Sequence, residues 1–201
     1  SPTFEKFSKN RSIIRDRLNN LNAQGEYGLN SQDVLIPAFI SAYSDSDPTS
    51  FSLKPFPKIP IPNWRIDFSG LSKIESLSEI FSNITISHGY QSIYSIGEFS
   101  NSLLYIDNLD FNNSIMNYPL ASQQTENGFV PFYIINQVRI TERFSPLIGV
   151  NVRTKTNLNA RIDYKKDRNI MLNLSNAQVS EMVNSDFSID FGYTKEKLKL
   201  P

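Results

Sequence analysis

The stretch Ile148-Gly-Val-Asn-Val-Arg-Thr-Lys155 and the one that follows it, Leu158-Asn-Ala-Arg-Ile-Asp-Tyr164, decide the fold of this 201-residue chain. Apolar and polar residues alternate one by one in both stretches. A period of two is typical of a strand, because successive side chains of a strand point to opposite faces of the sheet. The short polar run between the two stretches predicts a hairpin turn.

The alternation continues toward the C-terminus. Residues 170–175 and residues 187–194 again alternate apolar with polar side chains. Polar runs at 166–169 and 184–186 separate these segments and predict turns. We therefore predict consecutive hairpins of short strands over the last seventy residues.

Upstream of these hairpins the pattern is more varied. Residues 83–97 alternate and predict a strand, and residues 100–108 predict another, followed by a long Asn-rich and Ser-rich loop to Gly128. Before them, residues 64–68 predict a short strand and residues 72–81 a short helix. Residues 83–201 are therefore expected to hold the strands and their loops.

The N-terminal part has a different character. Apolar residues recur at helical spacing over residues 3–21 and predict an amphipathic helix, and residues 31–43 predict a second helix with Pro37 near its first turn. Alternating prolines over 54–62 predict an extended strap. We expect a helical insert at 1–50 and a segment of strap, strand and short helix at 51–82.

Strands with one apolar and one polar face have two interpretations. They fit the wall of a transmembrane β-barrel, and they fit a soluble β-sandwich whose apolar face packs on a second sheet. In the barrel, these residues are predicted to face lipid: Ile148, Val150, Val152, Leu158, Ala160, Ile162, Tyr164, Ile170, Leu172, Leu174, Phe187, Ile189, Phe191 and Tyr193. These are predicted to face the lumen: Asn151, Arg153, Asn159, Arg161, Asp163, Asn173 and Asp190.

Composition narrows the classes of function. Lys plus Arg and Asp plus Glu are both 20, so the chain has no net basic field for nucleic acid. Cysteine is absent, which excludes disulfides and thiolate zinc sites. No glycine-rich phosphate loop and no paired metal-ligand spacing occurs, so we expect no cofactor and no metal.

Three short motifs offer weak alternatives to a non-catalytic role. His88 is the single histidine, but Ser87 cannot be its triad partner, since adjacent strand residues point to opposite faces. The string Asp45-Ser46-Asp47 lacks the glycine and the distal glutamate of a calcium loop. Glu75 and Glu79 are expected on a solvated helix face. We therefore expect no enzyme, with a hydrolase based on His88 as the least favoured interpretation.

Several longer strings carry a resemblance to a known family. They are Asp33-Val-Leu-Ile-Pro-Ala-Phe39, Pro62-Asn-Trp-Arg65, Gly70-Leu-Ser-Lys-Ile74, Ser87-His-Gly-Tyr90, Pro146-Leu-Ile-Gly-Val150, and residues 161–176 with Gln178 and Glu181. In this order they resemble the C-terminal region of the SprA/Sov outer-membrane translocons of the type IX secretion system. The resemblance covers about residues 4–195.

The resemblance implies an arc of a very large antiparallel barrel, of about 36 strands, with short helical and proline-rich inserts. It further implies a bacterial outer-membrane channel whose wide polar lumen exports folded cargo proteins. The implied partners are the rest of the barrel, a plug protein, a PorV-like barrel protein, secreted cargo and outer-membrane lipid. The alternative is a soluble β-sandwich that acts as a cell-surface or periplasmic binding module. At 201 residues the chain is a small part of such a barrel, so we expect a segment of a processed or split translocon.

Overall fold

The computed structural model describes residues 2–21, 26–54, 56, 62–104, 124–125 and 128–195. The chain forms two compact units, each assembled from separate parts of the sequence. Unit 1 comprises residues 1–59, 95–139 and 171–180. Unit 2 comprises residues 60–94, 140–170 and 181–201. The long strands contribute residues to both units.

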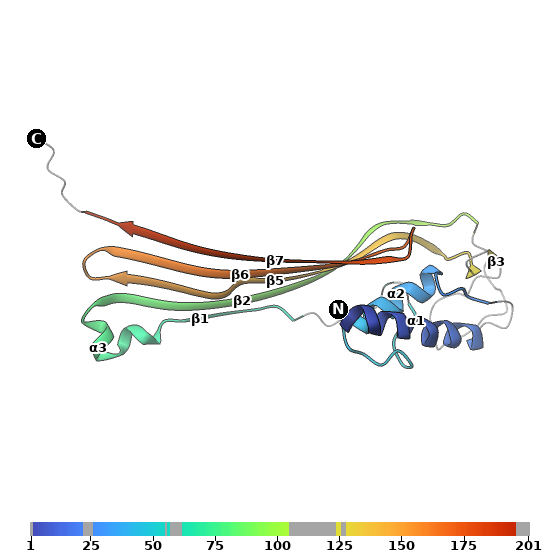
Figure 1. The fold of residues 1–201 in the computed structure, drawn as a ribbon, viewed down its shortest axis with the longest axis horizontal. Helices are drawn as coiled ribbons and strands as arrows, with labels where there is room; N and C mark the ends of the chain where they lie inside the picture. Colours follow the sequence, from blue (N-terminus) through green and yellow to red (C-terminus); the bar gives the residue numbers. More distant parts are fainter. Residues whose placement is uncertain are drawn as a thin grey trace, which may run out of the picture. The chain divides into compact units, whose positions relative to one another are not determined.

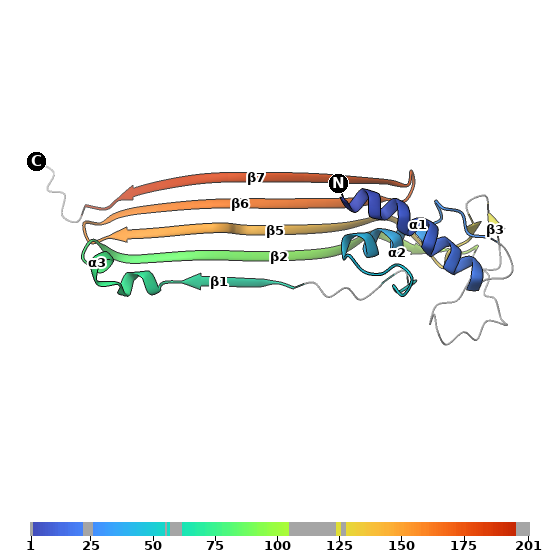
Figure 2. The same ribbon diagram turned by 60° about the horizontal axis from the view of Figure 1, so that its bottom comes forward.

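The dominant element is an open, five-stranded antiparallel sheet in the order β1-β2-β5-β6-β7 (Figure 1, Figure 2). Its strands are β1 (Trp64–Phe68), β2 (Phe81–Asn101), β5 (Tyr133–Thr154), β6 (Leu158–Asn173) and β7 (Gln178–Tyr193). A separate two-stranded sheet pairs β3 (Gln124–Thr125) with β4 (Gly128–Phe129). The predicted dominance of strands is therefore confirmed.

The strands of the main sheet are longer than the sequence pattern predicted. The turn predicted at 166–169 is wrong, because β6 continues through it, and the break predicted at 184–186 is wrong, because β7 continues there. In β6 the polar residues of the expected turn have partners on neighbouring strands: Arg168 pairs with Glu142 of β5 and Glu181 of β7. Opposite charges on adjacent strands stabilise a sheet, so polarity here does not end the strand.

Strand β2 shows the same departure. The sequence predicted one strand at 83–97 and another at 100–108, whereas β2 runs without a break from Phe81 to Asn101. Residues 102–104 are not in a strand, and residues 105–108 lie outside the described residues. Strand β5 begins at Tyr133, so its first half was not predicted as a strand. Most of the expected loop before Gly128 also lies outside the described residues.

Both predicted N-terminal helices are confirmed, as α1 (Pro2–Leu21) and α2 (Gln32–Tyr43). Every residue from 33 to 42 of α2 is buried, whereas α1 buries one stripe that includes Phe7, Ile14 and Leu18. The Phe7 and Phe39 rings meet edge to face, with centroids 6.3 Å apart. Helix α2 is thus the hydrophobic centre of unit 1.

One side chain joins helix α2 to strand β5 within unit 1. The Gln32 amide donates to the Tyr133 carbonyl at 2.6 Å, and its oxygen accepts from the Ile135 N–H at 2.7 Å. The strand residues Ile135, Val138 and Leu172 are buried in the same unit. Here the sheet and α2 share one core.

Unit 2 begins with strand β1, which pairs antiparallel with β2 so that Trp64 faces Tyr90 and Ile66 faces His88. The short helix predicted at 72–81 is wrong in its extent. A 3-10 helix, η1 (Gly70–Lys73), precedes a four-residue α3 (Glu75–Ser78), and β2 already begins at Phe81. Of the predicted proline strap, only Lys54, Phe56 and Pro62 lie within the described residues.

Candidate functional site

The two faces of the sheet in unit 2 are identified by Gly149. A Cβ atom at this position would lie 2.6 Å from the Ser87 hydroxyl and 2.8 Å from an Asp163 carboxylate oxygen. These residues therefore share one face, which we call the polar face. Because side chains alternate, the adjacent Ile148 and Ile162 belong to the other face, which we call the apolar face.

The apolar face of unit 2 is exposed over all five strands. Phe187 is 62% exposed, Ile148 58% and Phe191 74%. The other exposed apolar side chains in the apolar phase of these strands are Trp64, Ile66, Phe68, Ile86, Leu158, Ile162, Val183, Ile189 and Tyr193, while Ile93 and Met182 are exposed in the polar phase. A contiguous apolar surface of this kind marks contact with a protein, a membrane or a ligand.

The residues predicted to face lipid occupy three kinds of position. The exposed ones are Ile148, Leu158, Ile162, Phe187, Ile189, Phe191 and Tyr193. The half-buried ones are Val150, Val152, Ala160, Tyr164 and Leu174. Ile170 and Leu172 are buried, so these two do not take the surface position that the alternation predicted. The alternation of apolar and polar residues continues into the end of β6, where the apolar side chains are buried.

The residues predicted to face a lumen lie on the polar side of the alternation. Asn151, Arg153, Arg161 and Asp190 are exposed, and Asn159 and Asn173 are half-buried. Asp163 differs, because it is only 4% exposed and accepts from the Arg161 guanidinium at 2.7 Å. The missing side chain at Gly149 leaves the space that this carboxylate occupies.

An aromatic row crosses β1, β2 and β5 on the apolar face. The Trp64 and Tyr90 rings lie 4.5 Å apart, and the Tyr90 and Phe144 rings lie 4.8 Å apart. The His88 ring lies beside them, 6.3 Å from Trp64 and 6.1 Å from Phe144. Its Nδ1 donates to the Leu147 carbonyl at 2.6 Å, since a carbonyl can only accept. This bond gives His88 a structural role.

A row of polar groups borders the aromatic row and extends over four strands. The Tyr90 hydroxyl donates to Glu142 at 2.8 Å, and Arg168 bonds both Glu142 at 3.2 Å and Glu181 at 2.7 Å. The side chains of all three charged residues are less than 30% exposed. We call these four residues the polar row. Sequence reasoning missed it, although a charged residue in the apolar phase of each of three strands is a signal that was present.

The polar row sets one limit of the exposed apolar surface, and the β5–β6 turn at residues 155–157 sets the other. Between them, β5 runs from Phe144 to Val152. At a rise of about 3.3 Å per residue this is about 25–30 Å along the strand. This length is comparable to the apolar band of about 25 Å in outer-membrane barrels.

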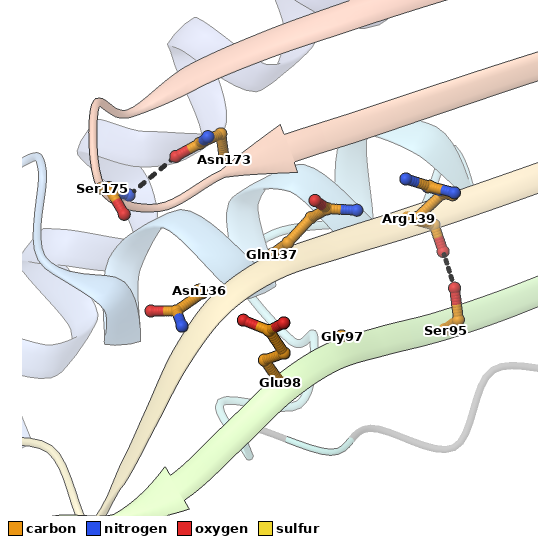
Figure 3. Close-up of a pocket in the computed structure, with 8 residues that line it drawn as sticks. All are labelled: Ser95, Gly97, Glu98, Asn136, Gln137, Arg139, Asn173 and Ser175. Carbon is orange, nitrogen blue, oxygen red and sulfur yellow. Dashed lines mark hydrogen bonds between the residues drawn. The ribbon is translucent and has the colours of Figure 1, made fainter.

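Unit 1 contains a polar pocket of about 400 Å³. Strand β2 supplies Ser95 and Glu98 to its lining, strand β5 supplies Asn136, Gln137 and Arg139, and strand β6 supplies Asn173 (Figure 3). The sequence alone does not reveal this pocket, because strand pairing brings together residues about forty positions apart.

The remaining motifs have ordinary structural roles. Asp45 pairs with Lys6, and Asp47 accepts from the Thr49 N–H at 2.9 Å and from its hydroxyl at 2.7 Å. These two bonds hold the pKa of the Asp47 carboxyl below its ordinary value. Glu75 and Glu79 are exposed at the short helix. In the described part of the chain, no group of three or more His, Asp or Glu side chains is placed to hold a metal ion.

Within the described residues, no helix combines the length and the apolar character that a membrane crossing requires. Neither the family models nor the curated proteins contain a match to this sequence. The arrangement of the two faces is therefore the basis on which a function is inferred.

Proposed function

We propose that this chain is a wall segment of an outer-membrane channel that conducts folded proteins, of the SprA/Sov type that the sequence resembles. The supporting observation is the exposed apolar face of unit 2, which ends at the polar row. In this proposal the apolar face contacts lipid tails, and the polar face borders a wide, water-filled lumen. Conduction through such a lumen needs no covalent chemistry.

The two borders of the apolar face support a membrane location. Aromatic rings with a polar end favour the membrane interface; Tyr90 belongs to the polar row, and the Trp64 ring lies directly beside it. Charged groups are expensive within hydrocarbon but are tolerated at its edge. Glu142, Arg168 and Glu181 would therefore lie at one interface, and Lys155 of the β5–β6 turn would lie at the other.

The polar face supports the lumen side of the proposal. Asn151, Arg153 and Asp190 are exposed there, and charged side chains on a lipid face would be strongly disfavoured. Both signs of charge occur, so the surface has no strong preference for anions or cations. Such a lining suits the passage of varied protein surfaces. The plug protein, the PorV-like protein and the remaining barrel strands are the partners that this proposal requires.

In the alternative, a soluble β-sandwich, the same apolar residues would be buried. The sandwich requires a second sheet packed against Ile148, Phe187 and Phe191. Among the described residues these side chains are exposed, and the second sheet comprises only the two-residue strands β3 and β4. The barrel wall accounts for the exposed surface without a further layer.

Single cysteines provide a direct test, because the chain has none of its own. Cysteine is placed in turn at Arg161, Ile162, Ile189 and Asp190 of the native protein, and labelling by a membrane-impermeant thiol reagent is measured in intact cell envelopes. We expect positions 162 and 189 to be protected and positions 161 and 190 to react. Equal labelling of each pair would overturn the proposal.

Detergent extraction of the same envelopes gives a second readout. We expect this polypeptide to remain with a larger barrel chain in mild detergent. If it is instead recovered as a soluble monomer without detergent, the binding-module alternative is correct.

A further inference from the structure

The polar pocket of unit 1 contains two opposite charges that do not pair with each other. The Glu98 carboxylate has no hydrogen bond or ion pair within the described part of the chain. The Arg139 guanidinium makes one weak contact, 3.9 Å to the Met171 sulfur. Both residues are exposed, so water solvates the two charges and both are accessible to a ligand.

The backbone of β2 places Glu98 at the pocket. Its φ of 49° lies in the left-handed region, where a residue other than glycine is strained. A strand residue in this conformation is typical of a bulge, which redirects a side chain and often lies near a binding site. In Figure 3, Glu98 lies toward Asn136 and Gln137 from the neighbouring strand.

Carboxamides occupy the space between the two charges. Asn136 and Gln137 of β5 have no hydrogen bond through their side chains within the described residues. The Asn173 oxygen already accepts from the Ser175 N–H, which leaves its amide donors free. Carboxamides carry both donors and acceptors, as the peptide group does. No aromatic or aliphatic side chain lines the pocket.

The strand geometry sets the spacing of the two backbone positions from which the charged side chains extend. The Ser95 hydroxyl donates to the Arg139 carbonyl at 3.5 Å, so these two residues are neighbours across β2 and β5. Glu98 lies three residues further along β2, which is about 10 Å at the usual strand rise. The ammonium and carboxylate groups of an extended tripeptide are also about 10 Å apart.

We propose that this pocket binds a short peptide segment in extended conformation that carries a cation and an anion about 10 Å apart. The cation meets Glu98, the anion meets Arg139, and the peptide groups between them bond the carboxamides. A neutral ligand such as a sugar would leave both pocket charges with water alone. This inference concerns unit 1 and is independent of the proposed function, which depends on the apolar face of unit 2.

The probe is the unblocked tripeptide Gly-Ser-Gly, and its control is the same tripeptide with an acetylated N-terminus and an amidated C-terminus. Binding to the full chain in detergent is measured by saturation-transfer NMR. We expect the blocked peptide to bind at least about tenfold more weakly, since it lacks both charges. Equal binding of the two peptides, or preferential binding of a neutral disaccharide, would overturn the inference.

Substitutions of Glu98 and Arg139 test whether each of the two charges contributes to peptide binding. We expect Glu98→Gln and Arg139→Gln each to weaken binding of the unblocked tripeptide about tenfold. The matched control is Arg153→Gln, which removes an exposed arginine of the same strand outside the pocket and is expected to leave binding unchanged. Equal effects of R139Q and R153Q contradict the proposal.

Exchanging the two charges between positions 98 and 139 distinguishes a loss of peptide binding from a loss of folding. The double variant E98R/R139E keeps one charge of each sign, and a tripeptide can bind it in the reverse direction. We expect binding to recover at least in part relative to the single variants, while circular dichroism confirms the strand content of all variants. Failure of the cysteine labelling pattern in unit 2 would leave this result unaffected, so the two proposals fail separately.

Discussion

The two units share the same long strands, but the apolar side of these strands is buried in unit 1 and exposed in unit 2. In unit 1, Val138 and Leu172 are fully buried in a core that also contains α2. In unit 2, Ile148 and Phe187 are more than half exposed. The alternation of residues is similar in both. Alternation therefore identifies the apolar side of a strand but does not identify what covers that side.

The largest expected contrast is between two phenylalanines. Phe39→Ala removes a fully buried ring of unit 1 and should lower the free energy of unfolding by about 3–5 kcal/mol. Phe187→Ala removes a largely exposed ring of unit 2 and should change it by about 0.5 kcal/mol or less. Denaturant unfolding in detergent measures both. Equal losses would show that Phe187 is packed as firmly as Phe39, and the distinction between the units would fail.

A charged side chain introduced on the apolar face tests whether that face contacts lipid or water. Ile189→Lys should destabilise the protein in a lipid bilayer by about 2–4 kcal/mol if the position lies near the bilayer centre. The control, Asp190→Lys on the polar face, should stay within about 0.5 kcal/mol. Unfolding in lipid vesicles compares the two variants. A harmless I189K would indicate that the apolar face of unit 2 meets water.

Removal of the cation of the polar row is expected to have a smaller effect on the free energy of unfolding. Arg168→Met leaves Glu142 and Glu181 together without their cation, and we expect a loss of about 1–3 kcal/mol. In unit 1, Arg15→Met removes an exposed pair with Asp16 and should lose about 1 kcal/mol or less. Unfolding midpoints at neutral pH measure both. If Glu142→Gln and Glu181→Gln fail to restore the R168M protein, the loss does not come from repulsion between the two carboxylates.

The smallest effect concerns Asp47 in unit 1. Bonds from the Thr49 N–H and hydroxyl lower its pKa in the folded protein. A carboxyl group with a lowered pKa stabilises the fold above its unfolded pKa of about 4, and this contribution is lost as the pH falls through the folded pKa. NMR titration should place the Asp47 midpoint below that of an ordinary aspartate. Thr49→Ala should raise the midpoint, and an unchanged midpoint would contradict the assignment.

The sequence predicted the helices well because their apolar spacing is regular. It predicted the strands of unit 2 in part, and it divided β6 and β7 where polar residues interrupt the alternation. Arg168 shows why: a polar residue in a strand and one in a turn differ by their partners, and Glu142 and Glu181 lie 26 and 13 positions away. Partners on other strands are not visible in local sequence.

The candidate sites were predictable to different degrees. The alternation assigned Ile148 and Phe187 to one face and Arg153 and Asp190 to the other, since that assignment needs only the strand period. The polar pocket could not be predicted, because it depends on the register of β2 against β5 and on the left-handed backbone of Glu98. Both are properties of the folded sheet.

In the described part of the chain, the sheet ends at β1 on one side and at β7 on the other. Terminal strands present a row of backbone groups that can accept another strand, and β1 covers only residues 86–90 of the much longer β2. The circumference of any closed assembly is therefore not encoded in these residues. The strands that pair with β1 and β7 at these two edges determine it, so the same five-stranded sheet is compatible with closed sheets of different circumference.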